Sequence, residues 1–174
     1  MKTLYDNNFR GHLPIFISHF LNQRTFQVRI DNTYSDTYIL ENGIPQGSVL
    51  SSTLFILAIN NVTKQLPNGV KSNLYVDDFT IFYTATNQRH MQRILNLAIA
   101  KVDKWASSVG FQLSAEKTKS VMFYRNARWI KKQSIELKIR NTIIPFNESA
   151  KFLGLIFDTH LNWKKHIAYC AVYN

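Results

Sequence analysis

Two carboxylates lie side by side between two apolar runs in the stretch Leu74-Tyr75-Val76-Asp77-Asp78-Phe79-Thr80-Ile81-Phe82. Residues 74–76 and 79–83 are rich in β-branched and aromatic side chains, which predicts two strands joined by a very short turn. Asp is common in turns because its side chain bonds nearby backbone N–H groups, so the pair alone is first explained as an ordinary turn. The pair also suits a divalent cation, because Mg²⁺ is typically held by one or two carboxylates together with substrate phosphates.

Around this hairpin, helical and strand patterns are mixed along one continuous chain. Apolar residues recur at helical spacing after Gly11, after the turn at 43–48, over 91–109 and from about Trp163. Strand patterns occupy residues 25–30, 34–40, 120–124, 135–139, 142–146 and 151–157. Most links between strands are too short for crossover helices. We therefore expect an α+β fold, in which an antiparallel sheet is backed by helices on one face.

The net charge of the chain indicates which class of binding partner it has. Its 174 residues include 21 Lys and Arg against 11 Asp and Glu, a net charge of +10. Residues 1–100 hold 8 basic and 6 acidic residues (+2), whereas residues 101–174 hold 13 and 5 (+8). A basic domain indicates a polyanionic partner, either nucleic acid or an anionic membrane surface.

The cysteine content and the hydropathy of the chain exclude several other classes of protein. A single cysteine, Cys170, excludes an intramolecular disulfide framework and a cysteine-rich zinc site. No apolar run is long enough to span a membrane, and no signal peptide is visible. We therefore expect an intracellular protein, nuclear or cytoplasmic, without a membrane partner.

A second stretch that can carry chemistry is Gly43-Ile44-Pro45-Gln46-Gly47-Ser48-Val49-Leu50-Ser51. Glycines let a ligand approach the main chain closely, and Ser48 is a candidate N-cap for the helix that follows. Free N–H groups at a helix start favour anions such as nucleotide phosphate. An ordinary strand-to-helix turn explains the Gly and Pro residues equally well, so this stretch alone does not decide between the two readings.

Together, the two stretches resemble the reverse transcriptases of non-LTR retrotransposons, most closely the insect-type, jockey-like LINE elements. The resemblance continues in the family's order. Residues 113–119, Leu-Ser-Ala-Glu-Lys-Thr-Lys, are similar to the family's next motif, and residues 152–166 resemble the segment that holds the primer end. Residues 20–24, Phe-Leu-Asn-Gln-Arg, resemble the helix end before the first hairpin. The sequence departs from the family at Ser52, where Pro is usual, and at Ser114-Ala115, where Asn-Pro is usual.

The resemblance implies a polymerase palm with part of the fingers over residues 1–174. It also implies DNA synthesis from dNTPs on an RNA template and a DNA primer, by a two-metal mechanism with Mg²⁺ or Mn²⁺. On this basis Asp77 is the main metal ligand on the hairpin and Asp78 its partner. Tyr75 would lie near the primer terminus, and Lys117 would neutralise or protonate the leaving pyrophosphate. Tyr75 could equally be a packing residue, and Lys117 a solvated surface charge.

Two further sets of residues take roles from the resemblance. Beside the template base and the incoming nucleotide we expect Pro45, Gln46 and Gly47. The primer grip would be formed by Phe152, Leu153 and Gly154, although Phe152 and Leu153 also suit a core.

The mechanism needs another metal-binding carboxylate from a strand facing the Asp77-Asp78 hairpin. The only acidic residue upstream of residue 24 is Asp6, and its surroundings resemble the region after the first catalytic motif. We therefore expect an N-terminally truncated fragment, whose partner is the upstream part of its own polyprotein. It belongs either to an active RNA-directed DNA polymerase or to an inactive remnant that at most binds nucleic acid. An RNA-templated RNA polymerase is a third hypothesis, which Gly43-Ile44-Pro45-Gln46-Gly47 argues against.

Overall fold

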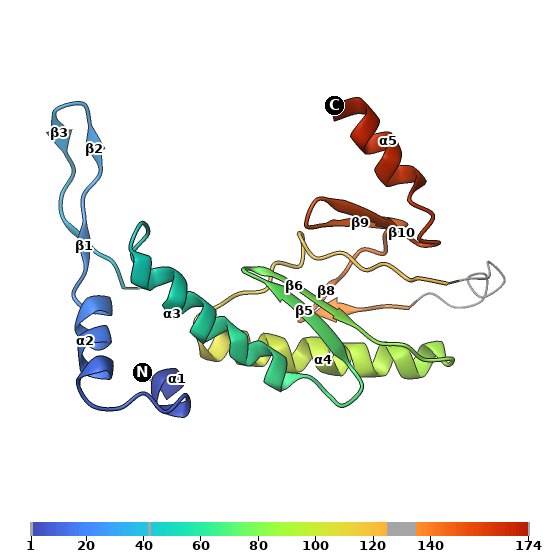
Figure 1. Ribbon diagram of the computed structural model, residues 1–174, viewed down its shortest axis with the longest axis horizontal. Helices are drawn as coiled ribbons and strands as arrows, with labels where there is room; N and C mark the ends of the chain where they lie inside the picture. Colours follow the sequence, from blue (N-terminus) through green and yellow to red (C-terminus); the bar gives the residue numbers. More distant parts are fainter. Residues whose placement is uncertain (1, 42, 125–134, 174) are drawn as a thin grey trace. The chain divides into compact units, whose positions relative to one another are not determined.

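The computed structural model describes residues 2–41, 43–124 and 135–173 as helices joined by short antiparallel hairpins (Figure 1). The chain divides into two units, Met1–Asn61 and Val62–Asn174. The mixed helix and strand content expected from the sequence is confirmed, and all five strand ladders among the described residues are antiparallel.

The first unit is built around a small apolar cluster of Leu4, Ile17 and Leu54. Ile17 comes from the helix predicted after Gly11, which is confirmed, whereas Leu13 and Phe16 of the same apolar pattern are exposed. The elements of this unit are α1 (Lys2–Asp6), α2 (His12–Leu21), β1 (Thr25–Phe26), β2 (Arg29–Ile30), β3 (Thr33–Tyr34), β4 (Tyr38–Ile39) and α3 (Val49–Ile59).

The strands predicted at 25–30 and 34–40 form one long hairpin with an interruption. Strand β2 pairs with β3 across the predicted turn at Asp31-Asn32, and β1 pairs with β4. Between them, the backbone N–H of Val28 bonds the hydroxyl of Ser35 at 2.9 Å instead of a backbone carbonyl. This side-chain substitution breaks each predicted strand into two short ones.

The second unit contains the Asp77-Asp78 hairpin. The boundary between the two units falls within the 3₁₀-helix η1 (Asn60–Gln65). The other elements of the second unit are β5 (Lys71–Tyr75), β6 (Asp78–Phe82), α4 (Gln88–Ser108), β7 (Lys138–Ile139), β8 (Thr142–Ile143), β9 (Ser149–Phe152), β10 (Leu155–Asp158) and α5 (Lys164–Tyr173). The helices predicted over 91–109 and from Trp163 are therefore confirmed.

The core of the second unit joins the hairpin to α4. Ile99 of α4 packs with Ile139 and Ile144, and Ile81 of β6 lies against this cluster. Burial of apolar side chains of this size is the main source of stability in such a core. Helix α4 and the Asp77-Asp78 hairpin are thus held by one shared set of contacts.

Polar contacts fix α4 against the β7–β8 hairpin. The Asn96 amide donates to the carbonyl of Glu136 at 2.9 Å and accepts the backbone N–H of Lys138 at 3.0 Å. Two helical turns further along α4, Asp103 accepts two hydrogen bonds from Arg140, at 3.0 and 3.1 Å. The hydrogen bonds and the charge of Asp103 raise the pKa of Arg140 above its ordinary value. These contacts set the register of the helix on the hairpin.

Three strand predictions are wrong in detail. Residues 151–157 form two strands, β9 and β10, with a turn between them, because Leu153 and Gly154 both adopt positive φ. Residues 120–124 form only a single bridge, from Ser120 to Phe146. The described strands form five separate two-stranded sheets rather than one continuous sheet. Strands of two to five residues expose few groups for pairing beyond their own hairpin.

Candidate active site

The β5–β6 hairpin presents its two carboxylates at an exposed tip. Tyr75 and Asp78 are the last cross-strand pair, and Val76 and Asp77 form the two-residue turn between them. Tyr75 is 59% exposed, and Val76, Asp77 and Asp78 are exposed as well. The very short turn predicted from the sequence is confirmed, and its apex carries the pair of acids.

Val76 makes this turn with a strained backbone. Its φ is +52°, a region that β-branched residues rarely enter because Cβ crowds the backbone. Such outliers gather at functional sites, where the surrounding structure holds them in place. Here the ladder from Lys71 to Phe82 holds the turn on both sides.

The donor set at the tip fits a divalent cation that draws on further ligands. Asp77 and Asp78 supply carboxylate oxygens, which Mg²⁺ prefers, and both are open to solvent. Among the described residues, no group of three or more His, Cys, Asp or Glu side chains is gathered for a metal. The pair therefore fits an ion whose remaining ligands are substrate phosphates, water or groups from outside this hairpin.

Lys117 lies in a turn that is anchored to the same core as the hairpin. The Ser114 hydroxyl accepts the backbone N–H of Lys117 at 3.3 Å, and the Thr118 hydroxyl donates to the Ser114 carbonyl at 2.6 Å. Leu113 and Ala115 pack against the cluster that also holds Ile81. Ser114, at one of the departures from the family pattern, thus closes the turn, and the Lys117 side chain is exposed.

The loop that follows Gly43 lies in the first unit. Gln46 and Gly47 are exposed, and Pro45 is half-buried. Ser48 occupies the predicted N-cap position of α3, but its hydroxyl makes no capping hydrogen bond, so that part of the prediction is wrong. Instead, the buried hydroxyl of Ser51 donates to the Pro45 carbonyl at 2.6 Å and holds the loop against the helix.

Phe152, Leu153 and Gly154 form the tip of the β9–β10 hairpin. Phe152 pairs with Leu155, and the turn between them has φ of +48° at Leu153 and +84° at Gly154. Two positive φ values are the pattern of a type I′ turn, which matches the twist of the strands. Leu153 is exposed and Phe152 is half-buried. The three residues are thus brought together at one apex, on a different hairpin from Asp77 and Asp78.

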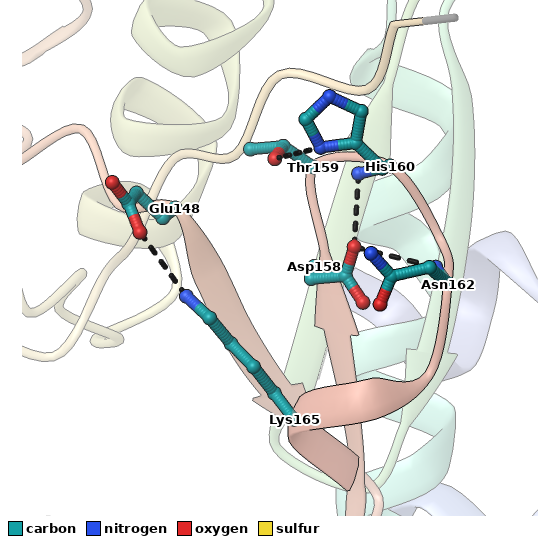
Figure 2. Close-up of polar contacts among 6 residues, drawn as sticks. All are labelled: Glu148, Asp158, Thr159, His160, Asn162 and Lys165. Carbon is teal, nitrogen blue, oxygen red and sulfur yellow. Dashed lines mark hydrogen bonds and ion pairs between the residues drawn. The ribbon is translucent and has the colours of Figure 1, made fainter.

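Asp158, at the end of β10, lies within residues 152–166, and the motif resemblance assigns no role to its side chain (Figure 2). Its carboxylate is 5% exposed and accepts backbone N–H groups from His160 at 3.0 Å, Asn162 at 3.3 Å and Trp163 at 3.1 Å. Burial raises the pKa of Asp158, but these hydrogen bonds and the nearby His160 outweigh burial, and the net pKa is lowered. The signal in the sequence is an Asp that lies six residues before the start of α5 at Lys164.

The loop held by Asp158 borders a cleft of about 330 Å³. Glu148 and Lys165 form an ion pair of 3.2 Å beside it, and the Thr159 hydroxyl lies 3.2 Å from Nδ1 of His160 (Figure 2). The Tyr124 ring packs edge-on against His160 at 4.8 Å between centroids. The Glu148–Lys165 ion pair ties α5 to the residue that precedes β9.

Comparison with known families agrees with the motifs. Residues 2–157 match the family described as reverse transcriptase (RNA-dependent DNA polymerase). This match covers most of the chain, including the Asp77-Asp78 hairpin, the Gly43–Ser51 stretch and the Lys117 turn. The chain belongs to the reverse transcriptase family.

Relatives among known proteins are polymerases of mobile elements. The chain is 25% identical, over 91% of its length, to the RNA-directed DNA polymerase from mobile element jockey of Drosophila melanogaster. It is 24% identical, over 96% of its length, to the probable RNA-directed DNA polymerase from transposon BS of the same species. The chain spans 18% of the length of each of these relatives. The resemblance to non-LTR retrotransposon enzymes is thereby confirmed.

A third relative comes from another insect. Over 44% of its length, the chain is 31% identical to the retrovirus-related Pol polyprotein from type-1 retrotransposable element R1 2 of Nasonia vitripennis.

Among the helices that the structure describes, none combines the length and the apolar character needed to cross a bilayer.

Proposed function

We propose that the chain forms the palm and part of the fingers of an RNA-directed DNA polymerase of a non-LTR retrotransposon. It would copy an RNA template by adding dNTPs to a DNA primer. The observation that carries this proposal is the exposed apex of the β5–β6 hairpin, where Asp77 and Asp78 lie together in a family-matched segment.

Asp77 and Asp78 would hold the divalent metal, Mg²⁺ or Mn²⁺. When bound, the metal supplies positive charge that stabilises an in-line displacement at phosphorus. The hairpin suits this task because five register pairs, from Lys71↔Phe82 to Tyr75↔Asp78, support both carboxylates. Tyr75, exposed beside them, would lie near the primer terminus.

Lys117 would meet the leaving pyrophosphate. Ser114 closes its turn, and the turn packs against the same apolar cluster as Ile81 of β6. The segments that carry the lysine and the two acids are therefore supported by the same core. An exposed ammonium group can neutralise or protonate a phosphate oxygen.

The two remaining sets of residues would bind nucleic acid rather than react with it. Around the template base and the incoming nucleotide we place Pro45, Gln46 and Gly47. At the primer end we place Phe152, Leu153 and Gly154, because they form one rigid turn with an exposed apolar apex. A further metal-binding carboxylate would come from the upstream part of the polyprotein.

Primer extension tests the assignment of the two acids. A labelled DNA primer on an RNA template is incubated with dNTPs and Mg²⁺, using the chain and the longer polyprotein that carries it. Asp77→Asn should abolish incorporation and leave template binding largely intact. Asp36→Asn, at an exposed position in the first unit, is the matched control and should extend like the parent. A rate near that of the parent in Asp77→Asn would show that the site is misassigned.

Binding without synthesis is the second candidate function, favoured by the charge of +8 over residues 101–174. In that case extension by the parent equals background, and Asp77→Asn changes nothing. The logarithm of the affinity for RNA would still fall steeply with the logarithm of the salt concentration, because each phosphate contact releases counterions.

A further inference from the structure

Arg24 joins three segments of the first unit. Its Nε donates to the carbonyl of Leu21 at 2.9 Å, at the end of α2. Its Nη2 donates to the carbonyl of Gly43 at 2.7 Å, where the loop before α3 begins. Its own carbonyl accepts the backbone N–H of Leu40 at 2.7 Å, just after β4. One residue therefore links the helix, the hairpin and the loop.

The loop is held at a second point two residues further on. The Ser51 hydroxyl, on a residue only 5% exposed, donates to the Pro45 carbonyl at 2.6 Å. The carbonyls of Gly43 and Pro45 are thus both fixed by side chains from outside the loop. Gln46 and Gly47 follow directly and are exposed. Their position is set by these two anchors.

The chemistry of the first anchor requires a guanidinium group. Nε and Nη2 belong to one planar group and donate to two different carbonyls, a forked geometry that the ammonium of a lysine does not reproduce. Nη1 is buried and has no hydrogen-bond partner among the residues that the structure describes. The head of the side chain is therefore partly enclosed, and truncation to alanine would leave a space of guanidinium size.

We propose that Arg24 is a positioning residue, which ties the end of α2 to Gly43 and thereby fixes the loop that presents Gln46 and Gly47 to the template base and the incoming nucleotide. This role rests on the proposed function, because it assumes that the loop binds nucleotide. The geometry of the tie itself does not depend on that assumption.

Amide hydrogen exchange tests the tie directly. In Arg24→Ala, the amides of Leu40 and Ser51, which bond the carbonyls of Arg24 and Ser48 at the two ends of the loop, should exchange at least about tenfold faster, because opening of the loop becomes easier. Amides of α4 should keep their rates. Millimolar guanidinium chloride should restore slow exchange, whereas the same concentration of sodium chloride should not. Arg24→Lys should behave like Arg24→Ala.

The matched control is Arg29→Ala. Arg29 is an exposed arginine of the same hairpin segment, and its guanidinium donates to the Asp31 carbonyl and lies over the Tyr34 ring. Exchange in the loop should be unchanged in this variant. Unchanged loop exchange in Arg24→Ala would overturn the proposal.

Nucleotide affinity tests the consequence. The Kd for dNTP and Mg²⁺ on the template–primer complex should rise about tenfold in Arg24→Ala, since binding must then order a loop that the parent already holds in place. Guanidinium should restore it, and Arg29→Ala should not change it. A loosened loop with an unchanged Kd would overturn the proposal. A parent that binds no dNTP would instead contradict the proposed function, and hydrogen exchange would still decide whether Arg24 fixes the loop.

Discussion

Tyr75 and Asp78 face each other as the last cross-strand pair of the β5–β6 hairpin, so the aromatic ring and one of the two acids leave the ladder at the same level. The turn beyond them has room for only Val76 and Asp77. A hairpin this short leaves the relative position of the two carboxylates little freedom, and the cost is borne by the backbone of Val76.

Relief of that strain should stabilise the protein. Val76→Gly removes the Cβ that crowds a backbone at φ of +52°, which is worth about 1–3 kcal/mol. Glycine also destabilises the folded state by about 0.5–1 kcal/mol, because the unfolded chain gains conformational entropy. The free energy of unfolding should therefore rise by about 1 kcal/mol, measured by urea denaturation. Val28→Gly, at an exposed valine with no positive φ, serves as the control and should not stabilise.

The pH dependence of stability should report Asp158. Its pKa is lowered in the folded protein, so its contribution is present above the unfolded-state pKa of about 4 and is lost as pH falls through the lower folded value. Thermal melts between neutral and acidic pH should show a loss of Tm in this range. Asp158→Asn should flatten that part of the profile, because an amide does not titrate in this range. It should also lower Tm at neutral pH, since Nδ2 cannot accept from Trp163 while the amide oxygen accepts from His160. A profile with unchanged slope would contradict this reading.

The shared core under the hairpin and the Lys117 turn should respond to truncation of Ile99. Ile99 is 7% exposed, and Ile99→Ala should lower the free energy of unfolding by about 2–5 kcal/mol. Ile167→Ala, at a helical isoleucine that is 64% exposed, should change it by less than about 0.5 kcal/mol. Equal losses in the two variants would show that this cluster is not the core of the second unit.

Lys117 should affect the rate of synthesis rather than the affinity for nucleic acid. If it acts on the leaving pyrophosphate, Lys117→Ala should lower kcat by about 10²–10⁴-fold with a smaller change in template affinity. Lys119→Ala, two residues away in the same exposed segment, should keep kcat near the parental value. A loss confined to affinity would make Lys117 an ordinary contact to the phosphate backbone.

Local patterns predicted the parts of this structure that depend on neighbouring residues. The β5–β6 turn follows from two strand-forming runs around Asp77-Asp78, and α4 follows from apolar spacing that ends at Gly110, whose φ is +82°. The turn at Asp31-Asn32 was equally accessible, because both residues favour turns.

Other features depend on contacts that no local pattern contains. The turn at Leu153-Gly154 was missed because a leucine rarely adopts positive φ, so residues 151–157 resemble one continuous strand. The break at Val28 depends on a hydroxyl seven residues away, on Ser35. The hydrogen bonds that Arg24 and Ser51 donate to distant backbone carbonyls could not be predicted, because arginine and serine side chains are equally common on a solvated surface. The roles of the ten predicted site residues stay predictions, and the kinetic experiments above test those of Asp77 and Lys117.

The contact between Asn96 and the β7 strand has a consequence for solubility. The open edge of a two-stranded hairpin offers unpaired backbone groups on which the strand of another molecule can dock. The Asn96 amide has the same donor and acceptor as a peptide group, and it already engages the carbonyl of Glu136 and the N–H of Lys138. A single side chain from α4 thus imitates a neighbouring strand for the length of one residue pair, and the hairpin is protected there from intermolecular β-pairing.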